Sequence, residues 1–310
     1  LVKVKKILPL IGIGIFLYIL FRLDFRRILS ELKNIRIEFL IVALIFLSLS
    51  VLSQTFKWFI IARTQKIKVR FPEALKANLI GEFYGFITPS KVGSLTRMAY
   101  IKKCEGYNHG KGASNYVLEK ILDVCSLIFL AVIFSFVFQK VLPQTFVYYS
   151  VVLFFILFSL LIFFRDKERT KKIFRGIYHK FIPKKIKQKV KNGFNSFYED
   201  MPQKRFFLIF FIINLINWII LYLFSFFIGL SLSINVPFFY FLAILPIATL
   251  VGLIPITISG LGTREATLIS LFGLFGISAT KVFSMSILSL IGGTIPAIIG
   301  IFLIFRSRSK

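Results

Sequence analysis

The chain has 310 residues, of which 57% are hydrophobic and 17% aromatic, and its mean hydropathy is +0.82. This composition excludes an ordinary soluble domain, which is less apolar and carries more charge. The formal net charge of +27 lies largely in short basic stretches between apolar ones, a pattern typical of the cytoplasmic side of a membrane protein.

The first apolar stretch, Ile7–Phe21, follows three lysines and looks at first like a secretory signal. No small-residue cleavage site comes after it, only the charged sequence FRLDFRR, and we therefore expect a retained anchor. It is shorter than the roughly 20 helical residues that cross a bilayer, so it spans only with help from its flanks.

Five later stretches are long and apolar enough to cross the membrane as helices: Phe39–Ala62, Tyr116–Phe138, Phe146–Phe164, Phe206–Leu230 and Val282–Phe305. Asn214, Asn217 and Trp218 lie inside one of them and are interpreted as contacts between helices. The sequence predicts an all-α polytopic integral membrane protein with about 6–8 transmembrane helices.

Residues 73–103 do not fit an ordinary span. This apolar segment carries Glu82 and is interrupted at Pro89 and Gly93. Proline removes a backbone donor and glycine permits a turn, so a continuous helix of spanning length is not expected here. We expect a segment that either dips into the membrane and returns or crosses it with a break.

Residues 165–205 form a basic stretch with 14 Lys or Arg against 4 Asp or Glu. Apolar residues recur every fourth position within it, as in a basic amphipathic helix at a membrane surface. Two interpretations remain open: a solvated cytoplasmic loop, or a loop that attracts anionic headgroups. We expect one membrane domain over residues 1–310, with halves 1–164 and 206–310 on either side of this cytoplasmic loop.

A second interrupted segment, residues 238–266, ends in the same pattern as the first. Its interruptions are Pro246, Ala248, Gly252, Pro255, Gly260 and Gly262. Both interrupted segments end with Ile-Thr-x-Ser followed by Gly-x-x-Thr-Arg, as GSLTR at 93–97 and GLGTR at 260–264. Counting spans with both termini cytoplasmic makes the second segment begin on the opposite side. Paired interrupted segments of this kind indicate an inverted repeat and a transporter's binding site.

The repeated pattern suits an anionic lipid headgroup. Glycines leave backbone N–H groups open, a helix N-terminus attracts anions, threonine donates a hydrogen bond, and arginine binds phosphate bidentately. The predicted lipid-phosphate site comprises Gly93, Thr96, Arg97, Gly260, Gly262, Thr263 and Arg264.

Four acidic residues lie within or beside the apolar segments, namely Glu82, Glu119, Asp123 and Glu265. An ionised side chain inside a membrane usually has a partner, so these residues can pair with the two arginines or carry protons for coupled transport. Arg264 and Glu265 are adjacent and point about 100° apart on a helix, so we do not expect them to pair with each other.

Enzymatic and metal sites find little support in the sequence. Cys104 and Cys125 do not form a disulfide framework, and His109 and His179 lie far apart in basic loops, so no metal site is expected. GYNHGKG at 106–112 lacks the spacing and the Ser or Thr of a phosphate-binding P-loop. We expect no cofactor, no nucleic-acid partner and no catalytic residues.

Three segments, ITPSKVGSLTRMAYIKK, VLEKILD and IPITISGLGTREATLISLFGLFGIS, resemble the lysylphosphatidylglycerol synthase transmembrane-region family, the flippase-like UPF0104 membrane proteins. The resemblance covers nearly the whole chain and implies functional roles for the residues that match the family's pattern. These residues are Pro89, Gly93, Arg97, Glu119, Asp123, Pro255, Gly260, Gly262, Arg264 and Glu265. Ser94 stands where the family commonly has an acidic residue, whereas Lys120 supplies the basic residue that the family commonly has beside Glu119.

The resemblance implies a cell-membrane protein that moves an anionic phospholipid or a polyprenyl-phosphate-linked lipid between leaflets. The two-domain synthases carry a large soluble domain after their membrane part, whereas this chain ends directly after its last span, so no aminoacyl-transferase activity is expected. One alternative is a non-transporting partner of a membrane enzyme, such as a lipid-modifying enzyme or a glycosyltransferase. Another is a membrane enzyme that acts on lipid phosphates.

Overall fold

The computed structural model describes residues 2–137, 204–254 and 260–308, together with isolated positions between and beside these ranges. All regular structure in these ranges is helical. The elements are α1 (Val2–Arg22), α2 (Phe25–Lys33), α3 (Ile37–Thr64), α4 (Phe71–Phe86), η1 (Pro89–Thr96), α5 (Arg97–Tyr100), α6 (His109–Val137), η2 (Lys204–Phe206), α10 (Phe207–Ser231), α11 (Phe238–Leu253), α12 (Thr263–Gly273) and α13 (Ala279–Arg308).

Three of the described helices are long and apolar enough to cross a membrane, namely α3, α10 and α13. Their outward faces are apolar, with exposed side chains such as Ile41, Ile45 and Leu49 on α3 and Ile298 and Phe302 on α13. Water would penalise such a surface, whereas lipid chains accept it. The prediction of an all-α polytopic membrane protein is confirmed.

Most expected elements lie where the sequence predicts them, with adjusted ends. The expected spans at 39–62, 206–230 and 282–305 correspond to α3, α10 and α13, and the described residues of the span at 116–138 lie within α6, which begins earlier and ends at Val137. The span expected at 146–164 and the amphipathic loop at 165–205 fall almost entirely outside the described residues. The short helix α2, which begins after the N-cap Asp24, was not predicted.

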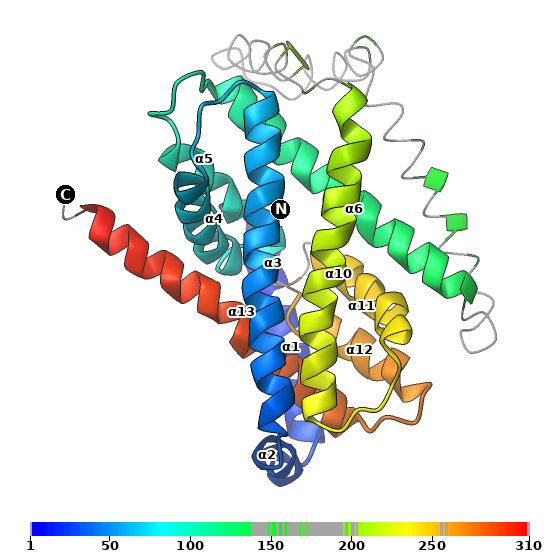
Figure 1. Ribbon diagram of the computed structural model, residues 1–310. Helices are drawn as coiled ribbons and strands as arrows, with labels where there is room; N and C mark the ends of the chain where they lie inside the picture. The colour runs from blue at the N-terminus through cyan, green and yellow to red at the C-terminus, as the bar shows by residue number, and fades with distance from the viewer. Residues whose placement is uncertain are drawn as a thin grey trace.

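Helices α3 and α10 run side by side in opposite directions through the centre of the molecule (Figure 1). At one end the Arg36 N–H donates to the Ser231 carbonyl at 2.9 Å. Further along, the rings of Phe46 and Phe227 stack with centroids 5.2 Å apart. This antiparallel pair joins the N-terminal half of the chain to the C-terminal half.

The first interrupted segment is a tight helical hairpin. Helix α4 ends at Phe86, and η1 and α5 return antiparallel along it. A Cβ atom at Gly93 would collide with the Tyr84 carbonyl oxygen, and one at Gly81 would lie 3.1 Å from Cβ of Arg97. The two glycines therefore allow the two helical arms of the hairpin to pack in direct backbone contact.

The second interrupted segment folds in the same way. Helix α12 returns along α11, with Phe272 packed on Phe241 at a ring separation of 4.9 Å. A Cβ atom at Gly260 would lie 2.7 Å from the Gly252 Cα, and one at Gly252 would lie 3.7 Å from Cβ of Arg264. Each hairpin thus places the Cβ atom of its motif arginine against a glycine of the preceding helix.

The helix α11 corrects one detail of the sequence interpretation. Pro246, counted among the interruptions of the second segment, lies within α11 and does not end it. A proline inside a helix removes one hydrogen bond, and here it is a buried residue in a helix held by packing on both sides. The break comes instead between Leu253 and Thr263, where Gly260 and Gly262 adopt φ of 79° and 85°.

A long helix of each half packs on the hairpin helix of the other half. Helix α13 packs on the hairpin helix α4 of the first half, and α6 packs on the hairpin helix α11 of the second. In Figure 1, α6 and α13 extend to opposite sides of the central α3–α10 pair. The packing of α13 on α4 is close, because a Cβ atom at Gly300 would collide with the Leu79 carbonyl oxygen.

Corresponding polar contacts form within each half. On the first half, the Asn78 amide of α4 donates to the Thr55 hydroxyl of α3 at 3.1 Å. On the second, the Tyr222 hydroxyl of α10 lies 3.3 Å from the Thr249 hydroxyl of α11. In both halves a polar contact thus joins the central helix to the hairpin helix that follows it.

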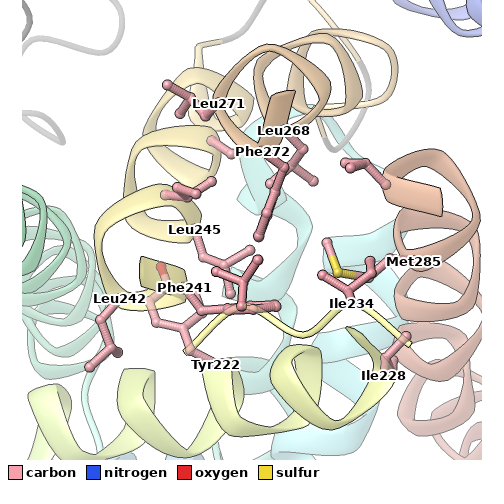
Figure 2. Close-up of a cluster of buried hydrophobic side chains, with 14 of the residues drawn as sticks. Tyr222, Ile228, Ile234, Phe241, Leu242, Leu245, Leu268, Leu271, Phe272 and Met285 are labelled. Atoms are coloured by element: carbon pink, nitrogen blue, oxygen red, sulfur yellow. The ribbon is translucent and has the colours of Figure 1, made fainter. Parts of the chain in front are cut away.

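A buried apolar cluster holds the second hairpin in place (Figure 2). Phe241 and Phe272 meet at its centre, Tyr222 and Ile228 enter from α10, and Met285 enters from α13. Because the cluster surrounds α11 and α12 on several sides, the start of α12 and its motif residues have a rigid support.

Candidate functional site

Four ionisable side chains meet between α3, α5 and α6. Lys57, Arg97 and Glu119 are each at most 1% exposed, and Asp123 is 13% exposed. Arg97 forms an ion pair with Glu119. The Lys57 Nζ lies 3.0 Å from Asp123 Oδ1 and 3.7 Å from Glu119 Oε1, between the two carboxylates. The spacing of four between Glu119 and Asp123 puts both on one face of α6.

Neutral groups from neighbouring helices complete the cluster. The Lys57 ammonium donates to the Asn214 side-chain oxygen at 2.6 Å, and the Asn214 amide donates to the Ser126 hydroxyl at 2.8 Å. Arg97 donates to the Asn78 side-chain oxygen at 3.3 Å and lies over the Trp58 ring, 5.4 Å from its centroid. Asn214, interpreted from the sequence as a contact between helices, thus also accepts a hydrogen bond from the buried Lys57 ammonium.

The four central charges balance. Taking ions out of water costs several kcal/mol each, and close partners offset this cost only while each charge is matched. At the edge of the cluster, the partly exposed Lys120 lies 3.4 Å from Asp123. Glu82 accepts a hydrogen bond from Gln54 at 2.9 Å and acts electrostatically on Arg97.

The other predicted residues of the first motif satisfy each other. The Thr96 hydroxyl donates to the Gly93 carbonyl at 2.8 Å, and the Gly93 N–H donates to the Thr88 hydroxyl at 2.7 Å. Beside them is an open hollow of about 630 Å³, lined by Thr88, Val92, Gly93, Leu95 and Thr96. In this structure the motif therefore faces a hollow, while Arg97 lies behind it in the charge cluster.

In the second motif, Glu265 stabilises the start of α12. Its carboxylate accepts from the Gly262 N–H at 2.6 Å and from the Ser286 hydroxyl of α13 at 2.7 Å. The Thr263 hydroxyl lies 3.3 Å from that of Thr257. Glu265 is 3% exposed and thus holds the helix start to α13, as an acid in the first turn of a helix commonly does.

The N-terminal helix α1 covers this second motif. A Cβ atom at Gly12 would lie 2.7 Å from the Leu261 carbonyl oxygen, and one at Gly262 would collide with the Gly12 carbonyl oxygen. The positive φ at Gly262 and this close approach both demand glycine. The backbone of the GLGTR turn is therefore shielded on the α1 side.

Arg264 differs from Arg97 in its surroundings. It is partly exposed, and within the described part of the chain it has no ion pair. Ser286 lies as far beyond Arg264 in the chain as Glu119 lies beyond Arg97, but its hydroxyl donates to Glu265. Among the described residues, Arg97 therefore has an ion pair and Arg264 does not.

The two arginines occupy separate places. Arg97 contacts α3, α4 and α6, whereas Arg264 lies in the first turn of α12 against α11. The structure thus brings Arg97, Glu119 and Asp123 into one cluster and leaves Arg264 and Glu265 in a second.

Lys57 is the site residue that sequence reasoning missed. It lies inside the expected span at 39–62. Because the surrounding residues are apolar, the mean hydropathy of the span stays high despite this single charge. A lysine within a membrane span is itself a signal, because it is costly without a partner. That signal points toward the Glu119 and Asp123 pair.

The chain is similar to known membrane proteins. The family model described as lysylphosphatidylglycerol synthase TM region matches residues 9–300. A UPF0104 membrane protein of Pyrococcus horikoshii is 24% identical over 98% of this chain and 97% of its own length. A UPF0104 membrane protein of Methanocaldococcus jannaschii is 26% identical over 96% of this chain and 94% of its own length.

Proposed function

Because the chain belongs to the lysylphosphatidylglycerol synthase TM region family, we propose that this membrane protein moves an anionic lipid between leaflets. The cargo is a phospholipid or a polyprenyl-phosphate-linked lipid, and its phosphate is the group recognised. We further propose that the chain is one cell-membrane domain with cytoplasmic termini and no catalytic activity of its own.

The observation that carries this proposal is the pair of broken hairpins, each with an arginine on its returning arm. Broken helices inside a membrane protein expose backbone groups and helix termini, which are the usual binding elements of transporters. Arg264 supplies a partly exposed guanidinium in the first turn of α12, and it has no ion pair among the described residues. A guanidinium binds a phosphate through two parallel hydrogen bonds, and more strongly where water is scarce.

Arg97 provides the second phosphate contact in this proposal, after release from Glu119. The hollow beside Gly93 and Thr96 lies next to it and gives a headgroup a place to enter. The exposed apolar faces of α3 and α13 keep the acyl or polyprenyl chain in the membrane while the headgroup passes. The two motifs then bind the same phosphate in turn, from opposite sides of the membrane.

The proposal is tested by reconstitution in liposomes. Exchange of a fluorescent lipid is followed through its accessibility to an impermeant quencher, with phosphatidylglycerol, a polyprenyl phosphate and zwitterionic phosphatidylcholine as separate cargoes. We expect exchange of one or both anionic lipids and little of phosphatidylcholine. The comparison of the two anionic cargoes tells which lipid class is moved.

Arg264→Ala should lower this exchange about tenfold or more, because it removes charge-assisted hydrogen bonds that are worth about 1.5–3 kcal/mol. Arg26→Ala on α2, an exposed arginine far from both motifs in the sequence, is the matched control and should exchange lipid like the wild type. Wild-type exchange by Arg264→Ala would remove Arg264 from the site. Absence of exchange for both anionic lipids would overturn the transport function.

A further inference from the structure

The position of Lys57 between two carboxylates has a consequence for Arg97. Lys57 Nζ is 3.0 Å from Asp123 and 3.7 Å from Glu119, so it now favours Asp123. Glu119 is held mainly by Arg97. Lys57 therefore pairs mainly with Asp123, and Arg97 pairs with Glu119. A change in the charge of Asp123 then alters which cation pairs with Glu119.

Asp123 is the most exposed of the four central side chains. It is 13% exposed, whereas Glu119 is fully buried, and its other oxygen lies 3.4 Å from the partly exposed Lys120. Of the two carboxylates, Asp123 is therefore the one that a proton can reach with less displacement of neighbouring side chains.

The charged and titratable groups around Asp123 come from every element packed against it. Lys57 faces it from α3, while Glu119, Lys120 and Cys125 lie near it on α6. The buried Tyr222 lies on α10, and Arg97 of α5 pairs with the neighbouring Glu119. Tyr116 and Glu82 act on Arg97 from α6 and α4.

Counting the charges explains why Arg97 is not free in this structure. The pairs Arg97–Glu119 and Lys57–Asp123 leave no net charge at the centre of the cluster. A phosphate that approached Arg97 would have to displace Glu119 and strand a buried carboxylate, which costs several kcal/mol. Neutralising one carboxylate removes this obstacle, since one cation then suffices for the other.

We propose that protonation of Asp123 releases Arg97 to bind the lipid phosphate, with Lys57 moving between the carboxylates. A proton from water adds to an Asp123 oxygen, which forms one O–H bond and leaves a neutral acid. The Lys57 ammonium then pairs with Glu119, and Glu119 gives up Arg97. One proton and one lipid phosphate bind together, and their charges balance in the cluster.

This inference rests on the proposed function for the identity of the ligand, and it makes a separate claim about binding. The purified full-length protein in detergent is titrated with short-chain phosphatidylglycerol, and in parallel with a short-chain polyprenyl phosphate, from about pH 5 to about pH 9. For one linked proton, the apparent affinity falls by up to about tenfold per pH unit above the titration range. Proton uptake on lipid addition is measured in weakly buffered solution.

Asp123→Asn mimics the protonated acid at every pH. We expect it to bind the lipid at alkaline pH as tightly as the wild type does at acid pH, with no pH dependence and no proton uptake. Asp123→Glu should restore the pH dependence, which separates the proton from a merely structural role. Glu38→Gln, an exposed acid on α3, is the matched control and should keep the wild-type profile.

Each result decides the inference. A wild-type pH profile in Asp123→Asn, or an affinity of the wild type that does not change with pH, overturns the role of Asp123 and leaves the transport function intact. Proton-linked binding without leaflet exchange in liposomes supports the inference while the transport function fails. If neither lipid binds at any pH, both proposals are overturned.

Discussion

At the scale of single residues, Lys57 shows how one side chain can hold several helices. Its ammonium joins α3 to α6 through Asp123 and Glu119, and to α10 through Asn214. Buried charges contribute little net stability when they are paired, but breaking a pair strands its partner. The cluster therefore fixes which helices meet more than it adds to the free energy of unfolding.

Lys57→Met should lower stability by about 3–5 kcal/mol, because Asp123 then loses its principal buried cation. The double variant Lys57→Met with Asp123→Asn should recover part of this loss, since no uncompensated charge remains. Thermal unfolding in detergent checks both. Lys68→Met removes an exposed ion pair with Glu105 and should change stability by only about 0–1 kcal/mol. Equal stability of the single and double variants would contradict the pairing.

At the scale of elements, glycine decides how closely helices approach. Helix α13 contains Gly293, around which a Cβ atom would meet nothing within 4 Å, and Gly300, where it would collide with the Leu79 carbonyl of α4. The two residues share one helix and one residue type. They differ only in what lies opposite.

Gly300→Ala should therefore destabilise the protein by about 1–3 kcal/mol, as overpacking typically does. Gly293→Ala is the control and should be neutral or slightly stabilising, because alanine favours a helix more than glycine does. Thermal unfolding of the two variants side by side gives the answer. A loss of stability in Gly293→Ala as large as that in Gly300→Ala would show that helix backbone effects, not the α4 contact, dominate.

The elements also show what sequence can and cannot predict. Apolar runs determine α3, α10 and α13, because crossing a bilayer demands length and hydrophobicity together. The glycine and proline pattern predicts two breaks, yet Pro246 stays within α11, because tertiary packing can hold a helix across a proline.

The site was predictable only in part. The sequence identifies Arg97, Glu119 and Asp123 as charges that need partners, but the match of Lys57 with Asp123 depends on how α3 crosses α6. Spacing along one helix predicts which residues share a face, whereas contacts between helices are set by packing of the whole bundle. For the same reason, the different surroundings of Arg97 and Arg264 follow from two similar motifs only once the fold is known.

At the scale of the whole molecule, the halves pack together along α3 and α10. In addition, α6 and α13 each pack on the hairpin helix of the other half. Transporters with inverted repeats work by moving one half against the other around a central site. We propose that this chain does the same, which requires the contacts between halves to change during each cycle. Phe134 of α6 and Phe239 of α11 stack across one such contact, with ring centroids 6.2 Å apart.

A covalent link across this contact should stop exchange. Phe134→Cys with Phe239→Cys, in a background with Cys104→Ser and Cys125→Ala, is joined by a short bis-maleimide. We expect lipid exchange to fall at least about tenfold while lipid binding persists. The two single-cysteine variants, treated identically, should keep their exchange. Full exchange after complete cross-linking would mean that this contact stays closed throughout the cycle.

In the proposed transport cycle, the unequal surroundings of the two motif arginines would give lipid movement a direction. Arg97 has Glu119 as an internal substitute for phosphate, whereas Arg264 has no ion pair among the described residues. In a lipid carrier, the Arg97 site would then close on an anion of the protein itself, whereas the Arg264 site would be occupied only by the lipid. The two similar sites would in this way favour transport in one direction over the reverse.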